Sequence, residues 1–290
     1  MGRILDGKKI AAEVFADVAA RAAALKKRSV IPGLATVLVG DDPASHVYVG
    51  QKLKKCVENG LASVHRPLPA TVSQEQLLQV VQDLNADTAV HGIIVQLPLP
   101  KHLDPEPIIR AVLPAKDADG LHPMNQGLIG RLKSWKEIES SGVPLPCTPA
   151  GVIYMLLRES IPVAGQNAVV VGRSALVGKP IYQLLLSLDA TVTIAHSRTK
   201  DLAAVCRSAD ILVAALGQPE FIKKDMVKPG AVVIDVGISR TDAGLRGDVD
   251  FKAVEPVASW ITPVPGGVGA MTVAMLLRNT VLAAERAVRS

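Results

Sequence analysis

Short β-branched runs that alternate with amphipathic helical patterns constrain this chain more than any other feature of its sequence. In the first half, the strand candidates are "GLATVLVG" (33–40) and the apolar run 93–95. In the second half they are "NAVVVG", "ATVTIAH", "ADILVAAL", "GAVVIDVG" and "ASWITP". Runs of this length between helical segments are typical of buried parallel strands. The alternation predicts an α/β fold with a parallel sheet, and the second half predicts a doubly wound domain.

Capping residues mark where several helices begin. Residues 7–28 repeat apolar side chains at helical spacing, with Asp6 available as N-cap. Asp42 is expected to cap the next helix, which has Pro43 at its first position. A last helix is expected over 270–287, after the glycine-rich "PVPGGVG". These boundaries place Tyr48 and Lys52 on the helix that Asp42 begins.

Length and charge limit what the chain does. Its 290 residues are enough for two domains of ordinary size. The net charge of +5 is scattered among acids and only 3% of residues are aromatic, which argues against a nucleic-acid surface. No stretch approaches the roughly 20 uncharged apolar residues that span a bilayer, so no membrane association is expected. The beginning of the chain, "MGRILDGKKI", lacks the apolar core of a signal peptide.

Cysteine usage points to a reducing compartment. The three cysteines, Cys56, Cys147 and Cys206, are widely spaced and form no CxxC pair. This pattern indicates neither a disulfide framework nor a zinc site. We therefore expect a cytoplasmic location and no metal.

The segment "VVVGRSALVG" carries the strongest local signal for a ligand. Gly172 ends a strand, Ser174 takes the place of the second glycine of a dinucleotide fingerprint, and Gly178 falls in the following helix. Such a turn brings backbone N–H groups and a helix N-terminus close to a pyrophosphate, and serine is small enough to fit there. A plain strand-to-helix turn is compatible with the same glycines. The flanking strand and helix favour the dinucleotide site.

The next strand end distinguishes between the two nicotinamide dinucleotides. An NAD site usually has Asp or Glu about 20 residues after the glycines, whereas this strand ends in His196, Ser197 and Arg198. Arg173, Ser197 and Arg198 can donate hydrogen bonds to a 2′-phosphate. The pattern therefore favours NADP, although Arg198 is also compatible with an ordinary surface charge.

Tyr48 and Lys52 lie four residues apart on a predicted helix and therefore share a face. Gln96 follows a predicted strand, and ligands of parallel sheets collect beyond the carboxyl ends of strands. A lysine in a partly desolvated pocket, held by hydrogen bonds from Tyr and Gln, can move protons near neutral pH. Taken alone, a Tyr and a Lys at this spacing are more often a packed ring and a solvated amine.

Two further segments are rich in turn-forming residues. "PAKDADGLHP" contains Asp117 and Asp119, which either shape the turn or leave one carboxylate to accept two hydrogen bonds from an amino-heterocycle. "ITPVPGGVGAMT" is either a rigid turn or a wall against which a flat ring lies. The residues alone leave both alternatives open.

Together, these segments resemble the bifunctional methylenetetrahydrofolate dehydrogenase and methenyltetrahydrofolate cyclohydrolase family. The matching pieces are "GDDPASHVYVGQK", "GIIVQLPLP", "KDADGLHPMN", "PCTP", "VVVGRSALVGKP", "GDVD" and "ITPVPGGVGAMTVAML". They follow the family's order and approximate spacing over nearly the whole chain, so the match is specific. Two departures are visible. The link "LKSWKEIESSGVPL" before "PCTP" is longer and more charged than usual, and Ala118 stands where a valine is common.

The resemblance implies two α/β domains with a cleft between them. The expected parts are a folate-binding catalytic domain over 1–147, a Rossmann-type NADP-binding domain over 148–270, and a C-terminal helix over 271–290 that packs back on the first domain. The composition of 132–149, rich in Ser, Gly and Pro, fits a connection between domains. The resemblance also implies a homodimer that binds tetrahydrofolate derivatives.

The family's functional residues fall on positions that the motifs already single out. The resemblance implies that Lys52 is the catalytic lysine, with Tyr48 near it at the reacting carbon and Gln96 hydrogen-bonded to it. Asp119 takes the position of the aspartate that holds the pterin ring. The cofactor-binding positions are Gly172, Arg173, Ser174, Ser197 and Ile238, and the substrate loop is Pro265, Gly266 and Gly267.

The implied reaction has two steps. A hydride passes from the methylene carbon of the folate to NADP, and water then opens the resulting methenyl ring to a formyl group. We expect Lys52 to serve the second step, which requires proton movement. Rival interpretations are a dehydrogenase without the second activity, a non-catalytic NADP-binding module, and a nucleic-acid-binding protein; the intact Tyr48, Lys52 and Gln96 argue against the first two.

Overall fold

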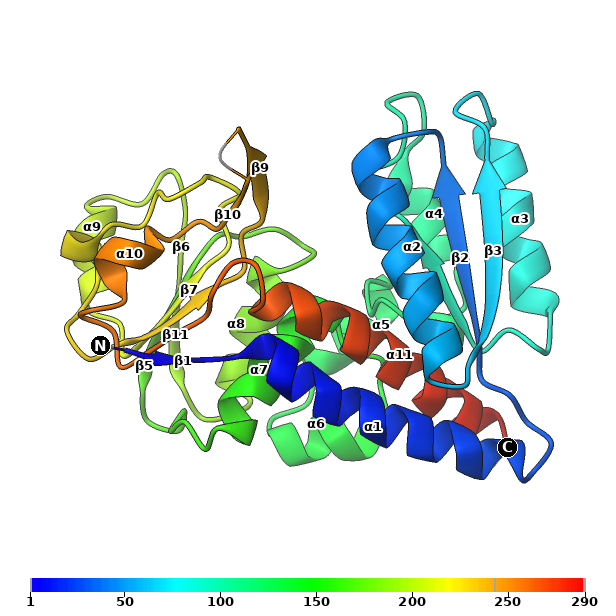
Figure 1. Cartoon of the computed structure of the whole chain (residues 1–290), viewed down its shortest axis with the longest axis horizontal. Coiled ribbons are helices and arrows are strands. Elements are labelled where there is room, and N and C mark those ends of the chain that lie inside the picture. Colours follow the sequence, from blue (N-terminus) through cyan, green and yellow to red (C-terminus); the bar gives the residue numbers. More distant parts are fainter. Residues whose placement is uncertain (1, 243, 289–290) are drawn as a thin grey trace. The chain divides into compact units, whose positions relative to one another are not determined.

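The computed structural model describes residues 2–242 and 244–288, which divide into two compact units (Figure 1). The three-stranded unit comprises 13–128, 142–145 and the chain from Leu276 onward. The six-stranded unit comprises the chain up to Ala12, 129–141 and 146–275. Each unit therefore collects three separate stretches of sequence.

The three-stranded unit is built on a parallel sheet. Its central strand β2 (Gly33–Val39), buried along its whole length, pairs in parallel with β3 (Ala62–Leu68) and β4 (Gly92–Val95). Helices α2 (Pro43–Glu58) and α3 (Gln74–Ala86) flank these strands (Figure 1). Alternate residues of β2 pack against Leu77, Val81 and Leu84 of α3 in one apolar cluster. The shorter helices of this region are α4 (Pro105–Ala111), η1 (Pro114–Lys116) and α5 (Pro123–Ile129).

The six-stranded unit contains the doubly wound sheet. Its strand order is β1 (Arg3–Ile4), β11 (Trp260–Ile261), β8 (Val232–Asp235), β7 (Ile211–Ala214), β5 (Asn167–Val171) and β6 (Thr191–Ala195), and every neighbouring pair is parallel. The chain moves outward from β5 to β6 and then returns to the other side of β5 for β7 and β8. This reversal is the switch point at which such folds bind nucleotides. The expected α/β fold with a doubly wound second half is confirmed.

Helices and a hairpin complete this unit. The helices are α6 (Trp135–Ser141), α7 (Cys147–Arg158), α8 (Gly178–Leu186), α9 (Leu202–Arg207), η2 (Lys224–Met226) and α10 (Phe251–Val254). Strands β9 (Ser239–Thr241) and β10 (Gly244–Arg246) form the antiparallel hairpin. Two long helices, α1 (Gly7–Lys26) and α11 (Val268–Ala287), each contribute residues to both units.

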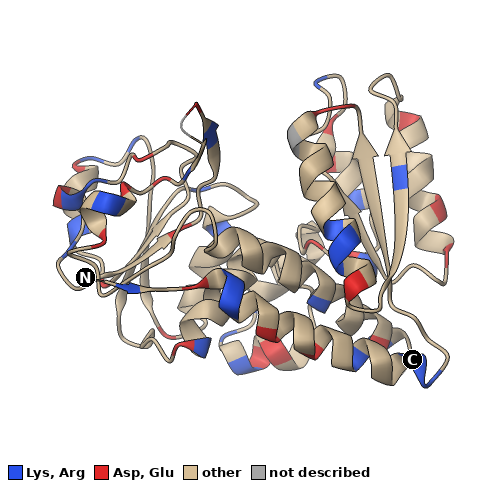
Figure 2. Cartoon of the chain, viewed as in Figure 1, with Lys and Arg blue, Asp and Glu red and all other residues tan. Residues whose placement is uncertain are grey.

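Basic and acidic residues are interspersed along the chain in each unit (Figure 2). Helix α11 is long and apolar enough to cross a membrane by length and composition, which the sequence prediction of no span did not anticipate. Of its most apolar window, 61% is buried inside the protein, as in the core helix of a globular fold. Length and composition alone are therefore weak support for a membrane span.

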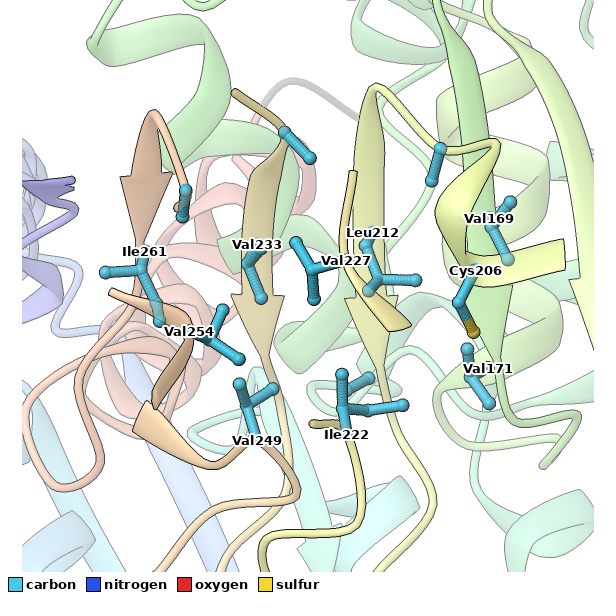
Figure 3. Close-up of a cluster of buried hydrophobic side chains, with 14 of the residues drawn as sticks. Val169, Val171, Cys206, Leu212, Ile222, Val227, Val233, Val249, Val254 and Ile261 are labelled. Carbon is cyan, nitrogen blue, oxygen red and sulfur yellow. The ribbon is translucent and has the colours of Figure 1, made fainter. Parts of the chain in front are cut away.

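Apolar side chains from the sheet and from the segments that cover it form the core of the six-stranded unit (Figure 3). Val171, Leu212 and Val233 come from adjacent strands, and Cys206 of α9 and Val254 of α10 pack against them. All five are fully buried. Burial of this kind is the main favourable term in folding, and it fixes the strand ends that carry the candidate cofactor residues.

Several local predictions are confirmed. The Asp42 carboxylate accepts a hydrogen bond from the backbone N–H of Ser45 at 2.8 Å, so it caps α2. Asp6 likewise accepts from the N–H of Lys9 at 3.0 Å at the start of α1. The helix predicted over 270–287 is α11.

The connection expected over 132–149 was only partly right. It contains helix α6, whose Ile138 is buried and whose Trp135 N–H donates to the Ser187 carbonyl at 2.8 Å. Serine and glycine in this stretch masked a short helix that tertiary contacts stabilise. Strand β1 was also missed, because two residues carry no periodicity.

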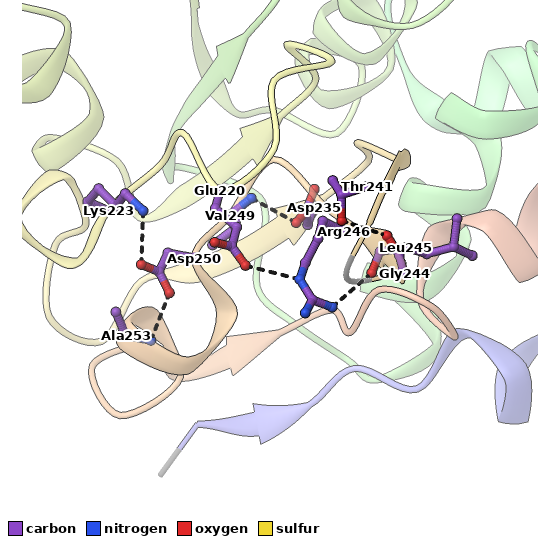
Figure 4. Close-up of polar contacts among 10 residues, drawn as sticks. All are labelled: Glu220, Lys223, Asp235, Thr241, Gly244, Leu245, Arg246, Val249, Asp250 and Ala253. Atoms are coloured by element: carbon purple, nitrogen blue, oxygen red, sulfur yellow. Dashed lines mark hydrogen bonds and ion pairs between the residues drawn. The ribbon is translucent and has the colours of Figure 1, made fainter.

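A buried carboxyl group ends strand β8. Asp235 is 3% exposed, and its carboxylate accepts backbone hydrogen bonds from Gly237, Asp248 and Val249. Figure 4 shows the last of these. Burial, with a smaller contribution from the charge of Asp248, raises the pKa of Asp235 from 3.8 to about 7 even though these hydrogen bonds lower it. The folded protein therefore holds this proton more tightly than the unfolded chain does.

This raised pKa predicts a pH dependence of stability. Between about pH 4 and pH 7 the unfolded chain has lost the proton while the folded protein keeps it, so the contribution of Asp235 falls as pH rises, by up to about 1.4 kcal/mol per pH unit. The asparagine of the Asp235→Asn variant carries no titrating proton, so the variant lacks this loss of stability. We expect the unfolding free energy of Asp235→Asn, relative to that of the wild type, to increase as the pH rises from about 4 to about 7. Urea unfolding of both proteins at several pH values measures the difference. Parallel pH profiles of the two proteins would contradict the assignment.

Candidate functional site

Lys52 and Gln96 meet at the carboxyl end of the three-stranded sheet. Lys52 lies on α2 and is only 8% exposed, and its Nζ donates a hydrogen bond to Gln96 Oε1 at 2.8 Å. Gln96 directly follows β4, and its Nε2 donates to the Leu97 carbonyl at 2.6 Å. The hydrogen bond that the resemblance implies is therefore present, and the amine is held in one position.

Tyr48 stands one helical turn before Lys52 on α2. Its side chain is 40% exposed, so it is a ring at the surface rather than a packed core residue. Cys56, one turn after Lys52, is fully buried, and its burial raises the pKa of the thiol to about 12 despite the nearby lysine charge. The same helix thus carries an exposed phenol, a mostly buried amine and an inert thiol in succession.

The two acids of "KDADG" have different roles. Asp117 is 5% exposed and accepts hydrogen bonds from the backbone N–H groups of Leu121 and His122 and from Asn125 Nδ2. Burial raises the pKa of Asp117, although these hydrogen bonds oppose the shift. None of the hydrogen bonds among residues 2–242 and 244–288 uses the Asp119 carboxylate. Asp117 therefore shapes the turn, and Asp119 is the carboxylate available to a ligand.

Asp119 lines a hollow at the end of β4. The other lining residues include Ile94, Val95, Leu97 and Leu121. Because Gln96 stands between Val95 and Leu97 in the chain, the hollow and the Lys52–Gln96 pair lie at the same strand end. Asp117 also lines this hollow, but its oxygens are taken up within the turn. An apolar wall beside the available Asp119 carboxylate suits a flat ring that carries N–H donors.

Sequence reasoning missed Asn279, a buried residue of α11. Its Nδ2 donates to the carbonyls of Ala118 at 2.9 Å and Leu145 at 2.8 Å, and the Ala118 N–H donates to the Ile93 carbonyl at 3.3 Å. The residue just before Asp119 is thus held on both sides. An asparagine inside an apolar helix is the signal that could have indicated this role, because a buried amide requires partners.

The cofactor candidates gather at the carboxyl edge of the six-stranded sheet. Gly172 follows β5, Ser197 follows β6 and Ile238 follows β8. Gly172 has φ +134°, and a Cβ there would overlap the Ala215 carbonyl oxygen in the loop after β7. A Cβ on Gly178 would overlap the Gly172 carbonyl oxygen in turn. These close approaches are the reason for glycine at both positions, and they place the turn at the switch point where folds of this kind bind a pyrophosphate.

The polar residues of this edge are accessible. The Ser174 hydroxyl oxygen accepts from the N–H groups of Val177 at 3.2 Å and Gly178 at 3.3 Å, so it holds the turn that leads into α8. Arg173, Ser197 and Arg198 are exposed. The side chains expected to donate hydrogen bonds to a 2′-phosphate are thus exposed to solvent.

The glycine-rich loop "PVPGGVG" also belongs to the six-stranded unit. It contains a cis peptide bond before Pro265 and a positive φ of +111° at Gly266. The Gly266 carbonyl accepts from the N–H of Lys8 at 3.0 Å, and a Cβ on Gly267 would overlap the Pro263 carbonyl at 2.5 Å. The loop is therefore a rigid turn. Among residues 2–242 and 244–288, no three or more His, Cys, Asp or Glu side chains are arranged to hold a metal ion.

Two family models together match most of the chain. The model for the tetrahydrofolate dehydrogenase/cyclohydrolase catalytic domain matches residues 5–119. The model for the NAD(P)-binding domain of the same family matches residues 146–288. Bifunctional protein FolD 1 of Rhizobium etli is 55% identical over 299 residues, which cover 99% of this chain and 97% of the relative.

Solved structures show the same likeness. The bifunctional enzyme FolD of Campylobacter jejuni, a methylenetetrahydrofolate dehydrogenase/cyclohydrolase, is 42% identical with a TM-score of 0.93 over 99% of both chains. The methylenetetrahydrofolate dehydrogenase-cyclohydrolase of Trypanosoma brucei, complexed with NADP and an inhibitor, is 38% identical. Its TM-score is 0.92 over 100% of this chain and 99% of the other.

The crowding at Gly172 gives a testable prediction. Gly172→Ala requires a strained positive φ and a clash with the Ala215 carbonyl, whereas Gly165→Ala requires only the strain, because nothing lies within 4 Å of its Cβ position. We expect the Gly165 variant to lose about 1 kcal/mol of unfolding free energy and the Gly172 variant to lose several times more. Thermal or urea unfolding measures both. Equal losses would show that the turn relaxes and that the close approach has little energetic importance.

Proposed function

The chain belongs to the tetrahydrofolate dehydrogenase/cyclohydrolase family, and we propose that it is a bifunctional folate enzyme of one-carbon metabolism. It oxidises 5,10-methylenetetrahydrofolate to the 5,10-methenyl form with NADP, and then hydrolyses that product to 10-formyltetrahydrofolate. The observation that carries the proposal is the buried Lys52 amine held by Gln96 at 2.8 Å. It supports the second activity in particular, because that step requires proton movement.

Oxidation depends mainly on positioning. The lone pair of a nitrogen next to the methylene carbon stabilises the cation that hydride loss leaves behind, so little acid or base help is needed. NADP, when bound, supplies the acceptor for that hydride. The protein then has to hold the reacting carbon in near-attack contact. Asp119 orients the pterin ring by accepting its N–H hydrogen bonds at the end of β4, where apolar side chains lie beside the carboxylate.

Ring opening requires proton movement. Water adds to the methenyl carbon, and a ring nitrogen must gain a proton as its bond to that carbon breaks. Lys52 moves the proton, with Gln96 fixing the amine and Tyr48 close to the reacting carbon. The limited exposure of Lys52 supports this role, because a lysine in bulk water would be too mobile to act at one atom.

The cofactor is held at the carboxyl edge of the six-stranded sheet. Gly172 and Ser174 would receive the pyrophosphate at the start of α8, and Arg173 and Ser197 would donate to the 2′-phosphate. Ile238 would lie against the nucleotide, and the rigid loop Pro265–Gly266–Gly267 would bound the substrate. The T. brucei enzyme's complex with NADP supports this choice of cofactor.

We also propose the setting in which the enzyme works. The family resemblance supports a homodimer, and three buried cysteines without CxxC spacing suit the reducing cytoplasm. The interspersed charges seen in Figure 2 support neither a nucleic-acid partner nor a membrane partner. By the same resemblance, residues 1–147 serve folate binding, 148–270 serve NADP binding and 271–290 pack back on the first domain.

An activity assay tests the proposal. Purified protein is given methylenetetrahydrofolate with NADP or NAD, and both NADPH absorbance and methenyl hydrolysis are followed. We expect turnover with NADP to exceed turnover with NAD. Lys52→Met should lower methenyl hydrolysis by at least about 100-fold while NADP binding persists. The exposed neighbour Lys54→Met, which loses only an ion pair to Glu58, is the matched control and should retain both activities.

Three outcomes of this assay contradict the proposal. Hydrolysis by Lys52→Met at an undiminished rate would remove Lys52 from the mechanism. Oxidation by the wild-type protein without methenyl hydrolysis would leave a dehydrogenase alone. Tight NADP binding by the wild-type protein without any folate turnover would indicate a non-catalytic module instead.

The two acids of the turn provide a second matched pair. Asp119→Asn should raise KM for the folate by about tenfold with little change in melting temperature, because this carboxylate makes no hydrogen bond within the described chain. Asp117→Asn should lower the unfolding free energy by about 1–3 kcal/mol, because its three donors lose a carboxylate acceptor. Steady-state kinetics and thermal unfolding separate the two. A folate KM unchanged in Asp119→Asn would exclude this carboxylate from ring binding.

A further inference from the structure

Two buried acids lie behind the cofactor edge of the six-stranded sheet and take no part in the proposed chemistry. Asp235 ends β8 and is 3% exposed, and Asp248 follows the β9–β10 hairpin and is fully buried. Buried acids are a poor means of stabilising a fold, since apolar residues would fill the same space at lower cost. Their contacts point to another role.

Asp248 holds the loop after β7. Its Oδ2 accepts from the backbone N–H groups of Leu216 at 2.5 Å and Gly217 at 2.9 Å, and its Oδ1 accepts from that of Gln218 at 2.8 Å. Three successive N–H groups thus converge on one carboxylate. This arrangement resembles the backbone nests that bind anions, with the anion supplied by the chain itself.

Asp235 holds the loop after β8. Its Oδ1 accepts from the N–H groups of Gly237 at 3.0 Å and Asp248 at 2.9 Å, and its Oδ2 accepts from Val249 at 2.9 Å. Figure 4 shows the Val249 contact. Because Asp248 is itself one of the donors, the two carboxylates form a continuous chain of contacts from the β7 loop to the β8 loop.

Glycines bring the backbone directly against both carboxyl groups. A Cβ on Gly237 would overlap the Asp248 carboxylate, and a Cβ on Gly247 would overlap the Asp235 carboxylate. No side chain separates the acids from these segments. The loops therefore have little freedom to move without breaking the hydrogen bonds.

Both loops border the candidate cofactor residues. The Ala215 carbonyl, directly before the residues that Asp248 holds, is the atom against which Gly172 packs. Ile238 directly follows Gly237, which donates to Asp235. The two acids thus set the position of the turn that receives the pyrophosphate and of the apolar side chain against the nucleotide.

We propose that Asp235 and Asp248 are positioning residues for NADP, which lock the loops after β7 and β8 in the geometry that the cofactor requires. This inference rests on the proposed function, because it takes NADP as the ligand of this edge. The acids do not touch the cofactor. They act through the backbone of residues 216–218 and through Gly237.

The test compares Asp248→Asn and Asp235→Asn with a matched control. Asp250→Asn is the control, because Asp250 lies two residues from Asp248 but is partly exposed, pairs with Lys223 at 3.0 Å and caps α10. NADP binding to the full-length proteins is measured by calorimetric titration, together with KM, kcat and the rate of methenyl hydrolysis. We expect Kd and KM for NADP to rise about tenfold in the two buried variants, with methenyl hydrolysis and kcat at saturating NADP within twofold of wild type. The control should bind NADP as the wild type does.

The outcomes separate this inference from the proposed function. Wild-type protein that binds no NADP would refute the proposed function itself. Wild-type binding with an unchanged Kd in folded Asp248→Asn and Asp235→Asn would overturn the positioning role alone. Equal losses of NADP binding and methenyl hydrolysis would also overturn it, because they would indicate a general effect on the fold.

A measurement on the wild-type protein covers the case in which the variants do not fold. Hydrogen exchange followed by mass spectrometry reports on the N–H groups of Leu216, Gly217 and Gln218. We expect these loop amides to exchange as slowly as those of the neighbouring strand β7, with or without NADP. Rapid exchange in the free protein would mean that the loop is not locked, and the proposal would fail.

Discussion

Parallel pairing of β5 with β6 on one side and β7 on the other brings three carboxyl strand ends to one edge of the sheet. Parallel pairing of β2 with β3 and β4 does the same in the other unit. Every candidate residue on a loop or helix start depends on this arrangement, because side chains far apart in sequence are neighbours only if their strands end together. Gln96 and Gly172 are the residues nearest to such ends.

Local signals explain how much could be predicted from the sequence. The strands, the Asp42 cap and the face shared by Tyr48 and Lys52 follow from periodicity and capping within about ten residues. The glycine of the dinucleotide turn was also recognisable, because a positive φ next to a backbone carbonyl admits little else. The hydrogen bond between Lys52 and Gln96 was expected from the family resemblance, because the separate motifs did not indicate that these two side chains meet.

The remaining features depend on the folded geometry, and most of them on partners distant in the chain. Asp117 and Asp119 look alike in the sequence, and only the folded turn directs the N–H groups of Leu121 and His122 and the Asn125 amide to Asp117. Asp248 meets the N–H of Leu216 across 32 residues, and Asn279 meets the Ala118 carbonyl across 161. Helix α6 lies in a stretch whose serines and glycine favour a loop, and its tertiary contacts decide otherwise.

The two-residue strand β1 forms the edge of the six-stranded sheet next to β11. It covers the outer side of β11, with the Arg3 guanidinium 5.4 Å from the centre of the Trp260 ring and Leu5 fully buried just beyond it. A strand this short presents almost no free backbone to an incoming chain. Shortening the N-terminus past Leu5 would uncover the backbone of β11 as a template for pairing, so Arg3 and Ile4 act as the cover of this sheet edge.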